Sequence, residues 1–177
     1  DLLRADEGNV TYQIAPRPLY TNKDPLATTT GHGSSSTSTY PCEDGQETLT
    51  INPAESEAWK QYVSAYIDEG FLIDFLTPEE YFSFLGKISN LGQDDINERL
   101  KQFERFAADE IFGQKKLIRN LSAGNKMKVG IISALLCRPH IVILDEPFNF
   151  LDPSSQMMLK HLLTDYAQQT GSTIVIS

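Results

Sequence analysis

Two acidic residues, Asp145 and Glu146, follow directly after a continuous apolar run, Ile141–Leu144. The β-branched and aliphatic residues of this run predict a parallel strand that is covered on both faces. Such a strand would deliver both carboxylates to the carboxyl edge of an α/β sheet, where open sheets bind ligands. Two adjacent carboxylates at that position suit a hydrated Mg²⁺ ion and the polarisation of an attacking water during phosphoryl transfer.

A helix start upstream of this strand could bind an anion. Ser122 is a good N-cap, and residues 123–136 follow it without a proline and with an apolar stripe at helical spacing. The first turn of a helix carries unpaired N–H groups and the positive end of the dipole, which suit a phosphate. Gly124 would allow a ligand to approach the backbone closely, and Lys126 and Lys128 would add positive charge.

Each of these two motifs also has a purely structural explanation. A Leu-Ser-x-Gly sequence can simply cap a helix, and an Asp-Glu-Pro sequence can simply end a strand. Here the two motifs occur in this order within residues 120–153, and a Leu-Asp-Pro sequence follows them. This combination favours a phosphate- and metal-binding site over two unrelated element ends.

The combined motif resembles the nucleotide-binding domains of the ATP-binding cassette (ABC) superfamily, and the resemblance extends over residues 63–177. Five residues resemble the signature loop of that family, with asparagine where glutamine is usual: Leu121, Ser122, Ala123, Gly124 and Asn125. Residues 141–146 resemble the Walker B strand with its catalytic glutamate. Three further residues resemble the D-loop, although phenylalanines at 148 and 150 replace the smaller residues common there: Asn149, Leu151 and Asp152.

The resemblance implies ATP and Mg²⁺ as cofactors and a role for each matching residue. Asp145 would orient Mg²⁺ through water, and Glu146 would polarise the hydrolytic water. The signature loop would contact the γ-phosphate of ATP held by the opposite subunit, through Ser122 and the Gly124 amide. Asp152 would organise the seam between the two ATPase subunits, which form a homodimer or a heterodimer.

Asp68 and Glu69 fall where the family places its Q-loop glutamine. In the family that glutamine senses Mg²⁺ and the attacking water and relays to the membrane domain of the transporter. Asp68 could take part in catalysis by coordinating the metal ion through a carboxylate oxygen. A charged carboxylate is, however, a harder ligand than the neutral amide of glutamine. The alternative is that these two residues form an exposed acidic turn without a catalytic role.

The surrounding sequence predicts the elements that would position these residues. The expected fold class is α/β, a partial P-loop NTPase (ABC ATPase) core with parallel strands and an α-helical subdomain. Residues 1–57 would form a partial antiparallel and variable region with a disordered Ser- and Thr-rich insertion, and with short strands at 10–12 and 47–51. Residues 58–118 would hold the Q-loop region and the helical subdomain. Residues 119–177 would form the signature, Walker B and D-loop part of the ATPase core.

The helical signals are clearest in the second half of the chain. Residues 77–80 have the pattern of a capping box that starts a helix. A second helix is expected from residue 94, as one amphipathic element that extends to about residue 107. A third would run over 153–169 and lead into a second buried strand at 172–177. Three aromatic residues of the helical subdomain are candidate partner contacts: Phe71, Phe75 and Phe84.

Two motifs of an intact ABC ATPase are missing from the sequence. A Walker A motif needs Gly-x-x-x-x-Gly-Lys-Ser/Thr, and the one Gly-Lys pair, Gly86-Lys87, is followed by isoleucine. The switch histidine of the family would come just after Ser177, and His32, His140 and His161 all lie elsewhere. We therefore expect an internal fragment, or a deletion form, of an ABC ATPase. It would hydrolyse ATP as part of the intact parent and be inactive as the isolated 177-residue chain.

Length, net charge and apolar runs limit the partners and the location that we expect for this chain. A length of 177 residues allows one domain with a sizeable core. A net charge of -9 argues against a nucleic-acid-binding surface, so no nucleic-acid partner is expected. The longest apolar run, residues 129–137, is too short to span a bilayer. The expected location is cytoplasmic, and peripheral on the inner face of the cell membrane through a partner permease subunit.

Three classes of function remain open at this point. The favoured one is the energy-coupling ATPase subunit of an ABC transporter. The second is a soluble ABC ATPase of the translation-factor or DNA-maintenance type. The DNA-maintenance type would need sustained heptads of a coiled coil, and none separate residues 68 and 122. The net negative charge does not suit the ribosome binding of the translation-factor type. The third is a non-catalytic interaction module that lost its P-loop. In such a transporter the permease would set the transported substrate.

Overall fold

The computed structural model describes residues 10–13, 38–41, 47–51 and 57–177 of the chain. It divides into two compact units, Asp1–Tyr62 and Val63–Ser177, and each is described by itself. All the residues with candidate chemistry belong to the second unit, which therefore receives most of the description.

The described part of the first unit holds a three-stranded antiparallel sheet. Its strands are β1 (Val10–Gln13), β2 (Ser38–Pro41) and β3 (Glu47–Ile51), in the order β1-β3-β2, and a short 3-10 helix, η2 (Glu57–Gln61), follows. The strands expected at 10–12 and 47–51 are confirmed. The Ser- and Thr-rich tract, residues 27–41, was expected to be disordered as a whole, which is wrong for Ser38–Pro41, because these residues pair with β3 as strand β2. The rest of that tract lies outside the described residues.

The second unit is built on a parallel sheet of three strands, β4 (Val63–Tyr66), β5 (Ile141–Leu144) and β6 (Thr173–Ile176). The order is β4-β5-β6, with Tyr66 opposite Leu144 and Leu144 opposite Ile176. Because the strands are parallel and in register, their carboxyl ends meet at one edge of the sheet. The α/β fold class expected from the sequence is confirmed.

The helices that connect β4 to β5 form the larger part of this unit. They are α1 (Pro78–Ile88), α2 (Gln93–Lys101), α3 (Glu104–Ala107) and α4 (Ala123–Leu136), with short 3-10 turns η3 (Glu69–Phe71), η4 (Ala108–Glu110) and η5 (Ile118–Asn120). The capping box predicted at the start of α1 is present, since the Thr77 and Glu80 side chains each bond to the other's backbone N–H.

The single helix expected over 94–107 is wrong, because the chain forms two helices there. The N–H of Phe103 donates to the carbonyl of Leu100 at 2.9 Å, which is a three-residue bond that tightens the last turn of α2 and ends it. Phe103 and Phe106, at and after the break, are both buried in the core. Local apolar spacing predicted the buried residues here but not the break between the helices.

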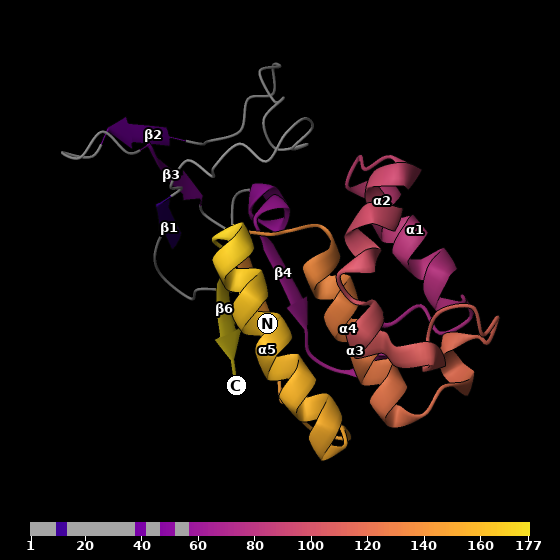
Figure 1. Ribbon diagram of the computed structural model, residues 1–177. Helices are drawn as coiled ribbons and strands as arrows, with labels where there is room; N and C mark the ends of the chain where they lie inside the picture. The colour runs from indigo at the N-terminus through magenta and orange to yellow at the C-terminus, as the bar shows by residue number, and fades with distance from the viewer. Residues whose placement is uncertain (1–9, 14–37, 42–46, 52–56) are drawn as a thin grey trace. The chain divides into compact units, whose positions relative to one another are not determined.

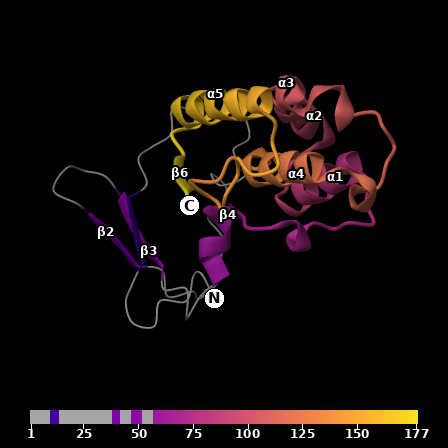
Figure 2. The same ribbon diagram turned by 90° about the horizontal axis from the view of Figure 1, so that it is seen from below.

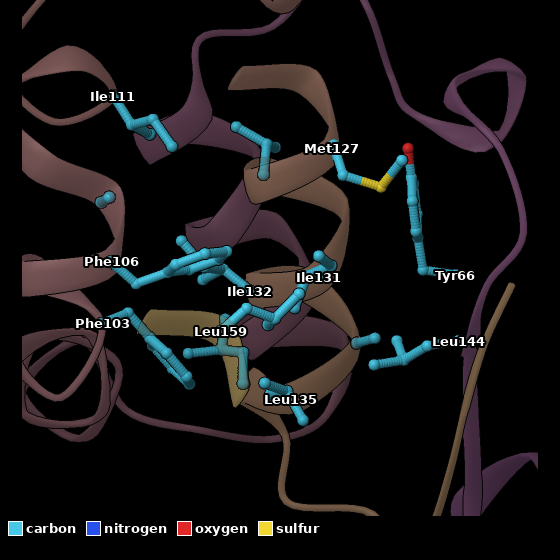
Figure 3. Close-up of a cluster of buried hydrophobic side chains, with 14 of the residues drawn as sticks. Tyr66, Phe103, Phe106, Ile111, Met127, Ile131, Ile132, Leu135, Leu144 and Leu159 are labelled. Carbon is cyan, nitrogen blue, oxygen red and sulfur yellow. The ribbon is translucent and has the colours of Figure 1, made fainter. Parts of the chain in front are cut away.

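Helix α4 is the centre of the core. It packs against the parallel sheet and against α1, α2 and α3, and both Figure 1 and Figure 2 place it between β4 and α1. Phe103 and Phe106 point toward Ile132 of α4 and toward Leu159, as Figure 3 shows. All of these side chains are buried, and full burial of each aliphatic or aromatic side chain contributes about 1.5–3 kcal/mol.

The close approach of α4 to the sheet depends on Gly130. A Cβ on this residue would lie 2.0 Å from a ring carbon of Tyr66 on β4, so no larger side chain fits without a shift. The Tyr66 ring is buried, and Met127 points toward it (Figure 3). Burial raises the pKa of Tyr66 to about 12, with a further contribution from the negative charges of Glu69 and Asp68. The tyrosine therefore acts as a neutral packing element between the sheet and α4.

Helix α5 (Pro153–Thr170) connects β5 to β6 and ends as expected at Gly171, which has a φ of 67°. Its Tyr166 hydroxyl donates to the carbonyl of Leu135 at 2.8 Å, which ties α5 to the end of α4. Across the described residues, no helix combines the length and the apolar character that a membrane crossing needs.

The strand expected at residues 172–177 is present as β6, but the expectation that it is buried is wrong. β6 is an edge strand within the described residues, because its pairing partner there is β5 on one side. Val175 is 48% exposed and Ile176 is 46% exposed. The apolar composition of the strand predicted burial on both faces, but burial depends on neighbours that composition does not reveal.

We predict that Gly130→Ala destabilises this unit by about 1–3 kcal/mol, because the added methyl group overlaps the Tyr66 ring and overpacks the core. The measurement is the free energy of unfolding from urea denaturation. The control is the same substitution in a Tyr66→Leu background, where the overlap is removed and alanine should cost less or even stabilise the helix. An equal cost in both backgrounds would contradict the packing explanation.

Candidate functional site

The candidate site lies at the carboxyl edge of the parallel sheet. The N–H of Asp145 donates to the carbonyl of Tyr66 at 3.0 Å, and the N–H of Glu146 donates to the carbonyl of Ser177 at 3.2 Å. These bonds continue the sheet ladder one step past β5. As a result, the structure brings both carboxylates to the edge where the sequence predicted them.

Glu146 is held in an unusual backbone conformation. Its φ is 44°, in the left-handed region that side chains other than glycine rarely adopt. The side-chain amide Nδ2 of Asn149 donates to Oε2 of Glu146 at 2.6 Å, and the backbone N–H of Asn149 donates to the Glu146 carbonyl at 3.0 Å. Glu146 is exposed, so the orientation of its carboxylate depends on the side-chain bond from Asn149 rather than on packing, and the backbone bond closes the turn between the two residues.

Asp68 forms part of a turn after β4. Its Oδ1 accepts a hydrogen bond from the N–H of Gly70 at 2.6 Å and so caps the short helix η3. Its neighbour Glu69 pairs with the ammonium group of Lys126 on α4, at 3.0 Å. The turn that follows β4 is therefore tied to α4 by an ion pair, and the Asp68 carboxylate caps η3.

The signature residues form the start of α4, as expected. The Ser122 hydroxyl oxygen accepts a hydrogen bond from the N–H of Asn125 at 3.2 Å, which leaves the hydroxyl proton available to a ligand. Ser122 and Ala123 are exposed, while Leu121, Gly124 and Asn125 are half-buried. The structure thus presents the open end of the helix to solvent.

Gly124 has a neighbour that the sequence did not reveal. A Cβ on this residue would lie 2.7 Å from the backbone carbonyl oxygen of Phe150, in the D-loop segment. From sequence, the glycine was interpreted as a point where a ligand approaches the backbone. In the structure, it allows the D-loop segment of the same chain to lie against the start of α4.

The two lysines near the start of α4 each have a partner in the structure. Lys126 is paired with Glu69, which offsets its charge. Lys128 is only 6% exposed, and its ammonium group lies 5.8 Å from the centre of the Phe106 ring. The expectation that both lysines add positive charge to a phosphate site stays a prediction, because Glu69 offsets part of the charge of Lys126 and the charge of Lys128 acts on Asp152, whose pKa it helps to lower.

The D-loop segment is held by side chains of α5. Asp152 caps this helix by accepting hydrogen bonds from the N–H groups of Ser154 and Ser155 and from the Ser155 hydroxyl. The hydroxyl bond of Ser155 is the main cause that lowers the pKa of Asp152. The Gln156 amide donates to the carbonyls of Phe148 and Leu151, both at 3.1 Å, and so holds the loop from its other side.

Sequence reasoning did not single out Asn149 and Gln156 as site residues. Asn149 was placed in the D-loop without a role, although it is three residues from Glu146, a spacing at which a turn can bring two side chains together. Gln156 carried a weaker signal, as a long amide side chain one turn after a helix cap. Both act through bonds across a loop, which local periodicity does not predict.

The residues at this edge fit a Mg²⁺–nucleotide complex better than a protein-held metal. Within the ranges that the structure describes, no group of three or more His, Cys, Asp or Glu side chains could hold a metal ion. Mg²⁺ commonly keeps several waters and binds one or two carboxylates together with substrate phosphates. Asp145 and Glu146 supply that number of carboxylates, and the exposed start of α4 suits a phosphate.

Residues 31–149 match the family model described as ABC transporter. The chain belongs to the ABC transporter family. The matched residues include the signature residues of α4 and the two carboxylates after β5, so the sequence resemblance to ABC proteins is confirmed at the level of the family.

Relatives of this ABC chain include proteins of two kinds. A methionine import ATP-binding protein of Protochlamydia amoebophila is 33% identical over 135 residues, which are 75% of this chain and 39% of that protein. Elongation factor 3 of Mycosarcoma maydis is 49% identical over 69 residues, which are 39% of this chain and 6% of that protein. The chain spans about half or less of the length of the first curated relatives that it matches.

A solved structure supports the ABC fold. The ATP-binding subunit of an ABC transporter has a TM-score of 0.63 and 24% sequence identity to this chain. The likeness covers 72% of this chain and 52% of the solved one. At this level of identity the likeness shows the fold alone.

We predict that the Asp152 carboxylate stabilises the folded chain in a pH-dependent way. Its pKa is lowered below the ordinary 3.8, so its contribution is present above that pH and is lost as the pH falls further, through the folded-state pKa. Asp152→Asn keeps an oxygen that can cap α5 but has no charge.

The measurement is urea denaturation of the parent chain and the Asn variant at pH 6 and at pH 3. The difference in stability should be larger at pH 6. A difference that is equal at the two pH values would mean that the charge of Asp152 does not stabilise the fold.

Proposed function

We propose that this chain is part of the ATP-hydrolysing subunit of an ABC transporter, which couples ATP hydrolysis to transport through a partner membrane permease. The observation that carries the proposal is the pair Asp145–Glu146 at the carboxyl edge of β5, in a chain that belongs to the ABC transporter family. The likeness over three quarters of the chain to a methionine import ATP-binding protein supports the transporter type.

Each site residue has a role that its surroundings support. Mg²⁺-bound ATP supplies the phosphoanhydride bond that is cleaved. The Asp145 carboxylate would hold the metal ion, which would supply positive charge to the phosphates, and the Glu146 carboxylate would polarise the attacking water. Because one oxygen of Glu146 already accepts from Asn149, the other oxygen remains to accept a proton from water. Asp68, at the position that corresponds to the Q-loop glutamine of the family, takes part in catalysis at the same edge of the sheet.

The signature residues act on a nucleotide held by a second ATPase subunit. The Ser122 hydroxyl and the Gly124 N–H donate to phosphate oxygens, with Leu121, Ala123 and Asn125 completing the loop. The P-loop that wraps this nucleotide is not among the 177 residues, so hydrolysis requires a P-loop from outside them. We therefore propose that the isolated 177-residue chain does not hydrolyse ATP.

Two features support a second subunit and a permease as partners. Phe150 is 74% exposed beside the start of α4, where a second ATPase subunit would cover it and where Asp152 fixes the adjoining helix. Phe71, Phe75 and Phe84 are also exposed, and large exposed apolar side chains are typical of surfaces that a partner covers. The subunit then lies on the cytoplasmic face of the membrane through the permease.

A second candidate function is a soluble ABC ATPase of translation. The 49% identity to an elongation factor 3 favours it, but this identity extends over only 69 residues. The net charge of -9 is unfavourable for a surface that binds ribosomal RNA. We therefore place this function second.

In the full-length parent, Glu146→Gln is expected to lower the ATPase rate by about 10²–10⁴-fold, because the amide cannot accept a proton from the attacking water. ATP binding should be kept, because the amide occupies the same volume. The measurements are steady-state phosphate release and equilibrium ATP binding. Glu104→Gln, at an exposed site on α3, is the matched control and should leave the rate unchanged. Undiminished turnover in the Glu146 variant would remove this residue from its role.

The double variant Phe71→Ser, Phe75→Ser of the parent should co-purify with less membrane permease than the unmodified protein, because it lacks two exposed apolar contacts. Met157→Ser, at an exposed apolar site on α5, is the control and should not change the yield. The measurement is mass spectrometry of detergent-solubilised complexes. Co-purification with ribosomes in place of a permease would instead support the translation function.

A further inference from the structure

We propose that Asn149 is a positioning residue for Glu146, and that Gln156 in turn holds the loop that carries Asn149. The inference deepens the proposed function and rests on it, since Glu146 is the group that polarises water there. Its basis is the network of side-chain hydrogen bonds across residues 146–156.

The first step is the bond between the two side chains. Nδ2 of Asn149 donates to Oε2 of Glu146 at 2.6 Å, a short distance that is typical of a hydrogen bond to a charged acceptor. Both side chains are exposed, so few packing contacts restrict the rotamer of the glutamate. The bond therefore selects one orientation of a carboxylate that would otherwise rotate.

The second step is the backbone beneath this bond. Glu146 has a left-handed φ of 44°, and the N–H of Asn149 closes the turn that follows on the Glu146 carbonyl at 3.0 Å. Residue 149 is thus bonded to residue 146 by both its main chain and its side chain. An asparagine at this position can make both contacts, whereas alanine can make only the main-chain one.

The third step is the support from α5. The Gln156 amide donates to the carbonyls of Phe148 and Leu151, which flank Asn149 on both sides. Leu151 is buried, and Asp152 caps the helix that carries Gln156. Contacts with a rigid helix of 18 residues therefore fix the position of Asn149, although the loop itself lies at the surface.

The positioning role makes a distinct kinetic prediction for the full-length parent. Asn149→Ala should lower kcat by about 10–100-fold, which is the scale of a misplaced catalytic group, and should leave KM for ATP nearly unchanged. Asn149→Asp has the same shape but no donor and should lower kcat further, because two carboxylates repel each other. Asn149→Ser keeps a donor and should retain more turnover than the alanine variant. Asn97→Asp, at an exposed site on α2, controls for the added charge.

The second readout needs no turnover. The side-chain amide resonances of Asn149, followed by nitrogen–proton NMR of the parent without nucleotide, should shift when Glu146→Gln replaces the charged acceptor. Gln156→Ala should broaden or shift the same resonances, since it releases the loop. The side-chain resonances of Asn97 serve as the reference and should stay in place.

The outcomes separate this inference from the proposed function. A fall in kcat in the alanine variant, partial rescue by serine and a shifted Asn149 resonance would support the positioning role. Unshifted resonances and an unchanged kcat, while Glu146→Gln abolishes turnover, would overturn the positioning role and leave the proposed function standing. Full turnover in the Glu146→Gln variant would overturn both.

Discussion

Two close contacts of one helix determine how the site is assembled. Helix α4 lies against the Tyr66 ring through Gly130, and against the Phe150 carbonyl through Gly124. A side chain at either position would force the two partners apart. The same helix therefore sets the distance to the sheet at one point and the distance to the D-loop segment at another. For this reason, the signature residues and the carboxylates after β5 have fixed positions relative to one another.

The segment after β5 carries backbone strain that its side chains stabilise. Glu146 and Phe150 both have left-handed φ values, 44° and 59°, and such conformations cost on the order of 1–3 kcal/mol each. Hydrogen bonds from Asn149 and Gln156 offset part of this cost. Strain of this kind persists where the surrounding structure over-determines a conformation. Here it turns Glu146 away from the strand direction and leaves Phe150 exposed.

Local signals predicted much of the fold, and non-local contacts account for the rest. The caps of three helices, at Thr77, Ser122 and Asp152, follow from residue type and spacing, because each cap bonds within its own first turn. The strand before Asp145 was likewise readable from its apolar run. The partner of Lys126, the neighbour of Gly124 and the exposure of β6 depend on residues distant in sequence. A single sequence carries no local trace of such contacts, so those expectations were wrong or were not made.

The exposed edge of β6 has a consequence for handling the chain. An edge strand presents a row of backbone N–H and C=O groups that another strand can join, and Val175 and Ile176 add exposed apolar side chains beside it. In the described structure β6 carries no charged residue or proline that would discourage such pairing. We therefore expect concentrated solutions of the 177-residue chain to self-associate along this edge. A further strand alongside β6 would satisfy the same backbone groups and protect the chain from aggregation.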